Sequence, residues 1–296
     1  MSVQPHLFSF GHGYSAQALT RLLLPRGWAV TGTTRDPDKA AAMRAAGVAA
    51  LLPGDDPAPA LRRATHLLVS AAPSDDGDPA IAALSPVLGA VAGGLAWAGY
   101  LSTTGVYGDH GGGWVDETTP LTPATRRGRL RVLAEDQWRA LADATGLPLH
   151  IFRLAGIYGP GRGPFAKVRA GTARQIVKPG QVFSRIHVDD IAQVLAASID
   201  RPDRGAVYNV CDDDPAPPED VLAHAAELLG LPEPPREDFA TAEMTPMARS
   251  FYAESKRVSN AKMRRDLGVA LIYPDYRSGL AALLAQETMA EGTAPD

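Results

Sequence analysis

The regular alternation of short apolar segments with helix-length segments constrains the fold of this chain more than any other feature. Across residues 1–155, six short apolar or β-branched segments predict strands: Leu7–Phe10, Ala29–Thr33, Val48–Leu52, His66–Ala71, Ala98–Ser102 and His150–Leu154. Helix-length segments separate them, and some end at a glycine that suits a helix C-terminus, as Gly146 does. Strands that alternate with helices build a parallel sheet, so this order predicts a doubly wound α/β domain.

After Leu154 the alternation of strand and helix segments becomes irregular, because loops rich in glycine and proline interrupt it. Helices are predicted there, with loops rather than regular strands between them, over Glu219–Leu229, Ser255–Leu267 and Arg277–Glu287. We expect a large domain over 1–160, to which 182–210 returns. Residues 161–181 and 211–296 then form a smaller lobe that closes over a ligand.

Composition excludes several classes of protein. The 296 residues carry a formal net charge of -4, so the overall lysine and arginine excess typical of a nucleic-acid-binding protein is absent. The single cysteine, Cys211, cannot form an intrachain disulfide, and no His or Cys spacing indicates a metal site. No signal peptide is visible, and no apolar stretch approaches the ~20 residues that cross a bilayer. We therefore expect a cytoplasmic protein with no membrane partner, no nucleic-acid partner and no metal.

Residues 11–16 read G-x-G-x-x-A, directly after the first predicted strand and at the start of a helix. Gly11 allows a sharp turn, Gly13 lets the backbone approach a diphosphate, and Ala16 permits close packing of the helix on the strand. The free N–H groups of the first helical turn, with Tyr14 and Ser15, then hold the anion. This position of the motif predicts a Rossmann-type domain that binds a dinucleotide.

The residues that follow the second strand bear on which dinucleotide is bound. An acidic residue there accepts a hydrogen bond from the adenosine ribose, whereas this chain has Thr34 and Arg35. An arginine beside a hydroxyl suits a 2′-phosphate, so NADP is predicted in preference to NAD. In the alternative interpretation, Arg35 is a solvated loop residue that contacts nothing.

Further motifs follow the first one in a characteristic order. They are V-S-A-A-P at 69–73, Y-L-S-T-T-G-V-Y-G at 100–108, F-R-L-A-G-I-Y-G-P-G at 152–161, R-I-H-V-D-D-I-A at 185–192 and Y-N-V-C-D-D at 208–213. Together they resemble the extended short-chain dehydrogenase/reductase family, which includes nucleotide-sugar epimerases and dehydratases, over most of the chain. The resemblance implies a nicotinamide near Ala71, Ala72 and Pro73. Arg153 is a further candidate for cofactor contact, or it satisfies loop carbonyls.

The same resemblance implies a catalytic Ser or Thr at Thr103, with Ser102 and Thr104 as adjacent candidates. The family's Tyr and Lys, which transfer the proton, match Arg127 and Arg131 instead. A guanidinium has a pKa above about 12, so it cannot exchange a proton as a phenol does. Tyr107 is a candidate for that role, as are Tyr158 and His187.

Three interpretations of these arginines stay open. In the first, the chain is an NAD(P)-dependent oxidoreductase or an epimerase/dehydratase-like enzyme, and Arg127 and Arg131 orient a polar, anionic, nucleotide-sugar-like small molecule. In the second, it is a non-catalytic NADP(H)-binding sensor or regulatory protein. In the third, the arginines form a solvated helix face paired with Glu135 and Asp136. We favour the enzyme because Thr103 and a substrate lobe are retained. The resemblance also implies a homodimer paired through long helices.

Overall fold

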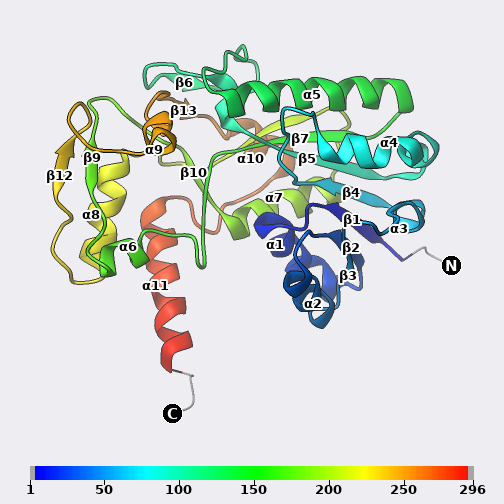
Figure 1. The fold of residues 1–296 in the computed structure, drawn as a ribbon, viewed down its shortest axis with the longest axis horizontal. Coiled ribbons are helices and arrows are strands. Elements are labelled where there is room, and N and C mark those ends of the chain that lie inside the picture. Colours follow the sequence, from blue (N-terminus) through cyan, green and yellow to red (C-terminus); the bar gives the residue numbers. More distant parts are fainter. Residues whose placement is uncertain (1–3, 293–296) are drawn as a thin grey trace.

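A seven-stranded parallel sheet forms the centre of the molecule (Figure 1), and the computed structural model describes residues 4–292. Its strand order is β11-β7-β5-β4-β1-β2-β3. The strands are β1 (His6–Phe10), β2 (Ala29–Thr33), β3 (Ala49–Leu51), β4 (His66–Val69), β5 (Trp97–Thr103), β7 (Leu149–Leu154) and β11 (Val207–Val210). Because the chain moves outward from β1 in both directions, the sheet is doubly wound, as predicted. The six predicted strands correspond to β1–β5 and β7, and no strand end differs from its predicted position by more than two residues.

Helices cover both faces of this sheet. One face carries α1 (Tyr14–Leu23), α2 (Pro37–Ala45), α7 (Val188–Asp200) and α10 (Ala261–Leu267), which share one apolar core with it. The other carries α3 (Ala58–Arg63), α4 (Pro79–Val91) and α5 (Arg126–Thr145), over a second core. In Figure 1, α4 and α5 lie above the strands, and α1 and α2 lie below them. The sheet is therefore shielded from water on both faces, as a parallel sheet requires.

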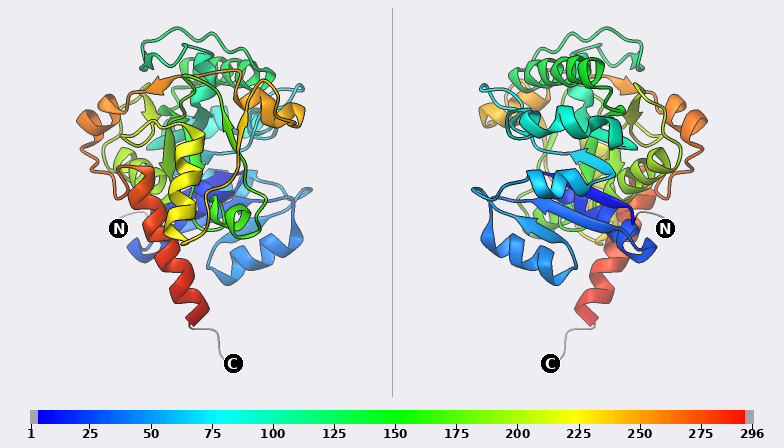
Figure 2. Two further views of the ribbon diagram at one scale, coloured as in Figure 1. Left: turned by 90° about the vertical axis from the view of Figure 1, so that its left-hand side faces the viewer. Right: turned by 90° about the vertical axis from the view of Figure 1, so that its right-hand side faces the viewer.

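A smaller lobe lies to the left of the sheet in Figure 1. Its helices are α6 (Phe165–Arg169), α8 (Pro218–Leu228), α9 (Pro246–Phe251) and α11 (Tyr276–Gly292). A third apolar core joins Phe165 on α6, Ala225 on α8 and Leu280 on α11. Figure 2 shows α8 and α11 side by side, with the second half of α11 extending beyond the rest of the fold.

Two expectations for this part of the chain are wrong. Short parallel pairs of strands form there: β8 (Gly156–Tyr158) with β10 (Arg185–His187), β9 (Gln175–Val177) with β12 (Arg236–Asp238), and β6 (Trp114–Val115) with β13 (Arg257–Val258). The helix predicted from Ser255 begins only at Ala261, because the backbone of 257–258 pairs with β6. Strands of two or three residues are too short to leave a periodic pattern in the sequence.

Short 3-10 turns complete the fold: η1 (Leu24–Arg26), η2 (Ala92–Gly94) and η3 (Thr104–Tyr107). Within residues 4–292, no helix is both long enough and apolar enough to span a bilayer.

Candidate functional site

The loops that follow β1, β4 and β5 meet at the carboxyl edge of the sheet. Gly11, with φ +78°, leaves β1 in the left-handed region, and a Cβ at this position would lie 2.8 Å from the backbone nitrogen of Ala71. The Ser70 hydroxyl donates to the Gly11 carbonyl, and the Gly11 amide donates to the Thr33 hydroxyl (2.8 Å). The first glycine of the motif is thus held between the ends of β4 and β2. Open α/β sheets bind ligands at this edge.

The N-terminus of α1 is suited to an anion. Gly13 is the N-cap, no side chain accepts from the first-turn N–H groups, and no acidic residue lies in that turn. A Cβ added to Gly13 would come no closer than 3.6 Å to the Gly11 carbonyl oxygen, and no φ strain opposes it. Uncapped amides beside an open approach fit a dinucleotide diphosphate. Ala16 is fully buried against the sheet, as the motif requires.

His12, between the two glycines, points into the protein. Its side chain is 2% exposed, and an added Cβ on Gly32 would lie 2.7 Å from the imidazole Cγ. Burial, aided by the charge of Lys39, lowers the pKa of His12 to about 4. His12 is therefore neutral near pH 7 and supplies no positive charge to an anion.

The end of β2 presents a cation to solvent. Arg35 is exposed, and among residues 4–292 no carboxylate or carbonyl pairs with its guanidinium. The Thr34 hydroxyl accepts from the Asp36 amide (3.3 Å), which leaves its own hydrogen free to donate. Asp36 caps α2 by accepting from the amides of Asp38 and Lys39. Asp36 is thus engaged in capping α2 and does not neutralise Arg35. The Thr34 hydroxyl and the Arg35 guanidinium are both available for a 2′-phosphate.

Thr103 ends β5 as a half-buried residue at the same edge. Its hydroxyl oxygen accepts from the Gly105 amide (3.2 Å), so the hydroxyl hydrogen is free to donate elsewhere. The neighbouring Ser102 is buried and donates to Glu135 (2.6 Å). Of the two, Thr103 is the hydroxyl that a ligand can reach.

The two arginines of α5 differ in environment. Arg131 is half-buried, and its Nη1 donates to the Leu101 carbonyl (2.8 Å), the Tyr100 hydroxyl (2.9 Å) and the Ala71 carbonyl (3.5 Å). Arg127 is exposed and has no hydrogen bond or ion pair within the part of the chain that is described. Arg131 is therefore fixed across the ends of β4 and β5, whereas Arg127 is free to move.

The proposed pairing of these arginines with Glu135 and Asp136 is wrong. Glu135 instead accepts from Arg139 (2.8 Å), and Asp136 also accepts from Arg139 (3.1 Å). Arg131 donates to the Leu101 carbonyl, whereas Glu135 accepts from the Ser102 hydroxyl.

Arg153 and Tyr107 lie in the interior. Arg153 is 3% exposed, and its Nε and Nη2 donate to the two carboxylate oxygens of Glu135 (3.1 and 2.8 Å). Its Nη1 donates to the Tyr107 hydroxyl (2.9 Å), which donates to Asn209 (2.7 Å). Every nitrogen of this guanidinium is used, so we assign Arg153 and Tyr107 to this buried network and not to contact with cofactor or substrate.

The other candidate proton donors are also buried. Burial raises the pKa of Tyr107 despite the opposing charge of Arg153, and burial likewise raises the pKa of Tyr158. His187 is fully buried, accepts from the Asp189 amide (3.2 Å) and has its pKa lowered by burial. None of these three side chains is exposed at the strand ends to replace the missing tyrosine.

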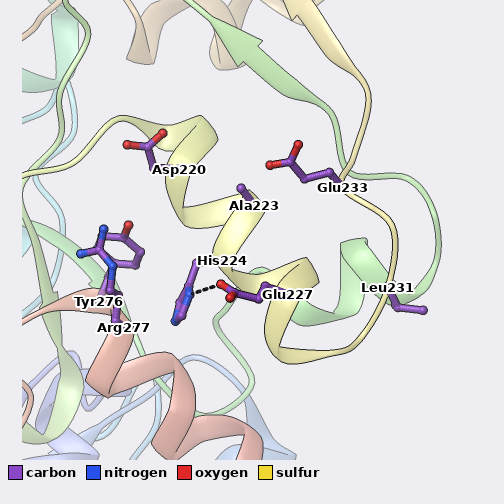
Figure 3. A pocket seen from close by; sticks show the side chains of 8 residues that line it. All are labelled: Asp220, Ala223, His224, Glu227, Leu231, Glu233, Tyr276 and Arg277. Atoms are coloured by element: carbon purple, nitrogen blue, oxygen red, sulfur yellow. Dashed lines mark hydrogen bonds and ion pairs between the residues drawn. The ribbon is translucent and has the colours of Figure 1, made fainter.

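A separate pocket of about 480 Å³ lies in the smaller lobe between α8 and α11 (Figure 3). It is lined by Asp220, Ala223, His224, Glu227, Leu231, Glu233, Tyr276 and Arg277. His224 contacts Glu227 (3.1 Å), and Arg277 pairs with Asp214 (2.8 Å). None of these residues belongs to the strand ends, so this pocket is distinct from the site at the sheet edge. Across the described residues, no cluster of three His, Cys, Asp or Glu side chains is arranged to hold a metal.

Sequence reasoning did not identify the roles of two residues that shape the edge. Ser70 holds Gly11 in place, and Glu135 carries the buried network behind Ser102. The position of Glu135, four residues after Arg131 on the same helix face, suggested only a pairing with Arg131, which the structure does not contain.

Comparisons with known proteins agree with this architecture. Residues 94–211 match the model of the NAD dependent epimerase/dehydratase family. Protein YeeZ of Escherichia coli (strain K12) is 31% identical over 280 residues, which cover 90% of this chain and 95% of that protein. A conserved protein of unknown function from Silicibacter pomeroyi is 62% identical, with a TM-score of 0.92 over 96% of this chain and 99% of that one.

A more distant structure shares the fold. The dTDP-glucose 4,6-dehydratase of Bacillus anthracis, solved in complex with NAD, superimposes with a TM-score of 0.77 at 16% identity, over 97% of this chain and 98% of that one. The resemblance inferred from the motifs is confirmed: the chain belongs to the NAD-dependent epimerase/dehydratase family, within the extended and atypical short-chain dehydrogenases/reductases.

Proposed function

We propose that this chain is an oxidoreductase that binds NADP in preference to NAD and acts on a small anionic molecule at the carboxyl edge of the sheet. The uncapped N-terminus of α1, next to the ends of β4 and β5, is the observation that carries the proposal. NAD is bound in the dehydratase that shares the fold, and the family whose model matches residues 94–211 is described as NAD dependent.

In this proposal the cofactor, when bound, supplies or accepts a hydride. The amides that follow Gly13 hold its diphosphate, and Ala71, Ala72 and Pro73 border its nicotinamide end. Arg35 and Thr34 bind the 2′-phosphate, and Lys39, which acts electrostatically on nearby His12, adds a second positive charge on this side.

Thr103 is the proposed catalytic hydroxyl. Since its oxygen is already engaged by the Gly105 amide, its hydrogen donates to the substrate oxygen whose charge changes during hydride transfer. Arg127 and Arg131 attract and orient the anionic substrate, and neither arginine carries a transferable proton at neutral pH. The proton that accompanies the hydride therefore exchanges with solvent.

One observation favours a second candidate, a non-catalytic NADP(H)-binding sensor. None of the three candidate proton donors is exposed at the strand ends, because Tyr107, Tyr158 and His187 are all buried. Such a protein would bind cofactor as tightly as the proposed enzyme but turn over no substrate.

Replacing Arg35 by alanine tests the cofactor preference. Loss of the charge-assisted hydrogen bond should weaken the binding of NADPH by about 1.5–3 kcal/mol, or roughly 10- to 100-fold in affinity. The affinity for NADH should stay nearly unchanged. Nicotinamide fluorescence titrations of both cofactors measure the difference. Arg62→Ala, an exposed arginine on α3, is the matched control. Equal losses for the two cofactors would contradict the assignment.

Replacing Thr103 tests the catalytic proposal once a panel of carbonyl compounds and sugar nucleotides yields a substrate. Thr103→Ala should lower turnover by roughly 100-fold, the scale of one lost transition-state donor, with cofactor affinity preserved. Thr103→Ser retains the hydroxyl and should retain most of the activity, and Thr104→Ala is the neighbouring control. If turnover by Thr103→Ala matched that of the unaltered protein, Thr103 would be a turn residue only.

A further inference from the structure

The loop between β8 and α6 lies against the first turn of α1, although the two are far apart in sequence. The Tyr14 hydroxyl donates to the Pro160 carbonyl (2.9 Å) across a separation of 146 residues. Tyr14 is the first residue of α1, directly after the Gly13 N-cap. This loop therefore reaches the anion-binding end of the helix.

The loop is held in one shape. Gly159 and Arg162 exchange backbone hydrogen bonds, with the Gly159 amide donating to the Arg162 carbonyl (3.1 Å) and the Arg162 amide to the Gly159 carbonyl (2.9 Å). Gly159 has φ +151°, and a Cβ there would lie 2.5 Å from the Tyr14 hydroxyl oxygen and 2.7 Å from Val188. Only glycine fits so close an approach, and the tight turn directs the Arg162 side chain toward Tyr14.

Arg162 reaches α1 as a charge without an acidic partner. Its Cζ lies 5.7 Å from the centre of the Tyr14 ring, and the side chain is exposed. Over residues 4–292, no carboxylate forms an ion pair with it. Asp189, which also acts electrostatically on Tyr14, is paired with Arg21 (3.4 Å).

No residue of the G-x-G-x-x-A motif brings a positive charge to this end of the helix. Residues 11–16 include one titratable base, His12, which is buried and neutral. A dinucleotide diphosphate carries about two negative charges, against roughly half a positive charge from the helix dipole. The helix amides alone therefore cannot neutralise the charge of the diphosphate. A guanidinium can, because it is positively charged and its paired N–H donors match the phosphate oxygens.

We propose that Arg162 is a cofactor-binding residue that pairs with the cofactor's diphosphate, so that the loop 159–163 clamps the bound dinucleotide onto α1. The inference rests on the proposed function, since it assumes that a dinucleotide occupies this edge. It differs from the role of Arg35 in a measurable way. The diphosphate is common to NADH and NADPH, whereas the 2′-phosphate belongs to NADPH alone.

The test is the affinity of the intact chain for NADH and for NADPH, measured by nicotinamide fluorescence. Arg162→Ala should weaken both cofactors by about tenfold and to the same extent, and the loss should shrink as salt is raised. Arg162→Met keeps an apolar stem over Tyr14 but removes the charge, so it should behave like Arg162→Ala. Arg169→Ala on α6, whose guanidinium already pairs with Glu287, is the matched control and should change neither affinity.

The outcomes separate the two proposals. If the unaltered chain binds both cofactors and Arg162→Ala binds them equally well, the clamp is wrong and the proposed function stands. If Arg162→Met retains full affinity while Arg162→Ala loses it, packing on Tyr14 acts instead of charge, and the diphosphate assignment is overturned. If the unaltered chain binds neither cofactor, both proposals fail.

Discussion

Replacing Glu135 by alanine is expected to lower the free energy of unfolding by about 3–5 kcal/mol, the range for breaking a buried ion pair. Glu135 is fully buried and accepts hydrogen bonds from both the Arg153 guanidinium and the Ser102 hydroxyl. Without the carboxylate, Arg153 would remain in the interior with a positive charge and two donors unsatisfied. The cost would be the desolvation of that charge, which one hydrogen bond to Tyr107 cannot offset.

The neighbouring acid provides the control. Asp136 also pairs with Arg139, but its side chain is 64% exposed, so Asp136→Ala should cost at most about 0.5 kcal/mol. Urea unfolding of both variants measures the contrast. A Glu135→Ala variant that is no less stable than Asp136→Ala would refute the assignment of the buried network.

The contribution of the Glu135–Arg153 ion pair to stability should depend on pH. Burial acts to raise the pKa of Glu135, but the hydrogen bonds and charge of Arg153 outweigh it, so the pKa is lowered from 4.5. A carboxylate with a depressed folded pKa stabilises the protein above its unfolded pKa, and this contribution is lost as the pH falls through the folded value. The difference in stability between the unaltered chain and Glu135→Ala should therefore narrow below pH 4.5.

Replacing Gly13 by alanine is expected to weaken NADPH and NADH by roughly 10- to 100-fold while the free energy of unfolding stays within about 0.5 kcal/mol. The new methyl group would make an ordinary van der Waals contact, 3.6 Å from the Gly11 carbonyl oxygen, and needs no positive φ. The same space is where the backbone must approach a diphosphate, so the methyl group obstructs the ligand and not the fold.

A substitution at Gly11 would not separate the effect on cofactor binding from the effect on stability. Its φ of +78° and the 2.8 Å approach to Ala71 mean that Gly11→Ala would strain the loop itself and lose stability together with binding. Gly93→Ala, at a position with no atom within 4 Å and no positive φ, is the better control. Undiminished cofactor affinity in Gly13→Ala would show that the diphosphate does not lie over this turn.

The sheet and its dinucleotide motif could be predicted from the sequence because their determinants are local. Each of the first six strands is a short apolar segment bounded by turn residues, and Gly11, Gly13 and Ala16 act within one turn of chain. Asp36 is a similar case, since its position before Pro37 predicts the cap that the structure contains.

The buried network could not be predicted, because its charges look solvated in the sequence. Arg153 lies in a strand whose residues are all buried, and Glu135 lies on a helix among exposed charges, so only their packing reveals the pair. The approach of the Arg162 loop to Tyr14 is likewise invisible locally, since 146 residues separate Tyr14 from Pro160. Long-range contacts of this kind are set by how the lobe packs on the sheet, which hydrophobic periodicity does not encode.

The central claim is that the carboxyl edge of this sheet binds a nicotinamide dinucleotide and prefers the 2′-phosphorylated form. Titration of NADPH and NADH with the purified chain, followed by nicotinamide fluorescence, tests it most directly. The account predicts saturable binding of both cofactors, with NADPH roughly 10- to 100-fold tighter because of Arg35. The absence of binding by either cofactor would contradict the account, and tighter binding of NADH would contradict the role of Arg35.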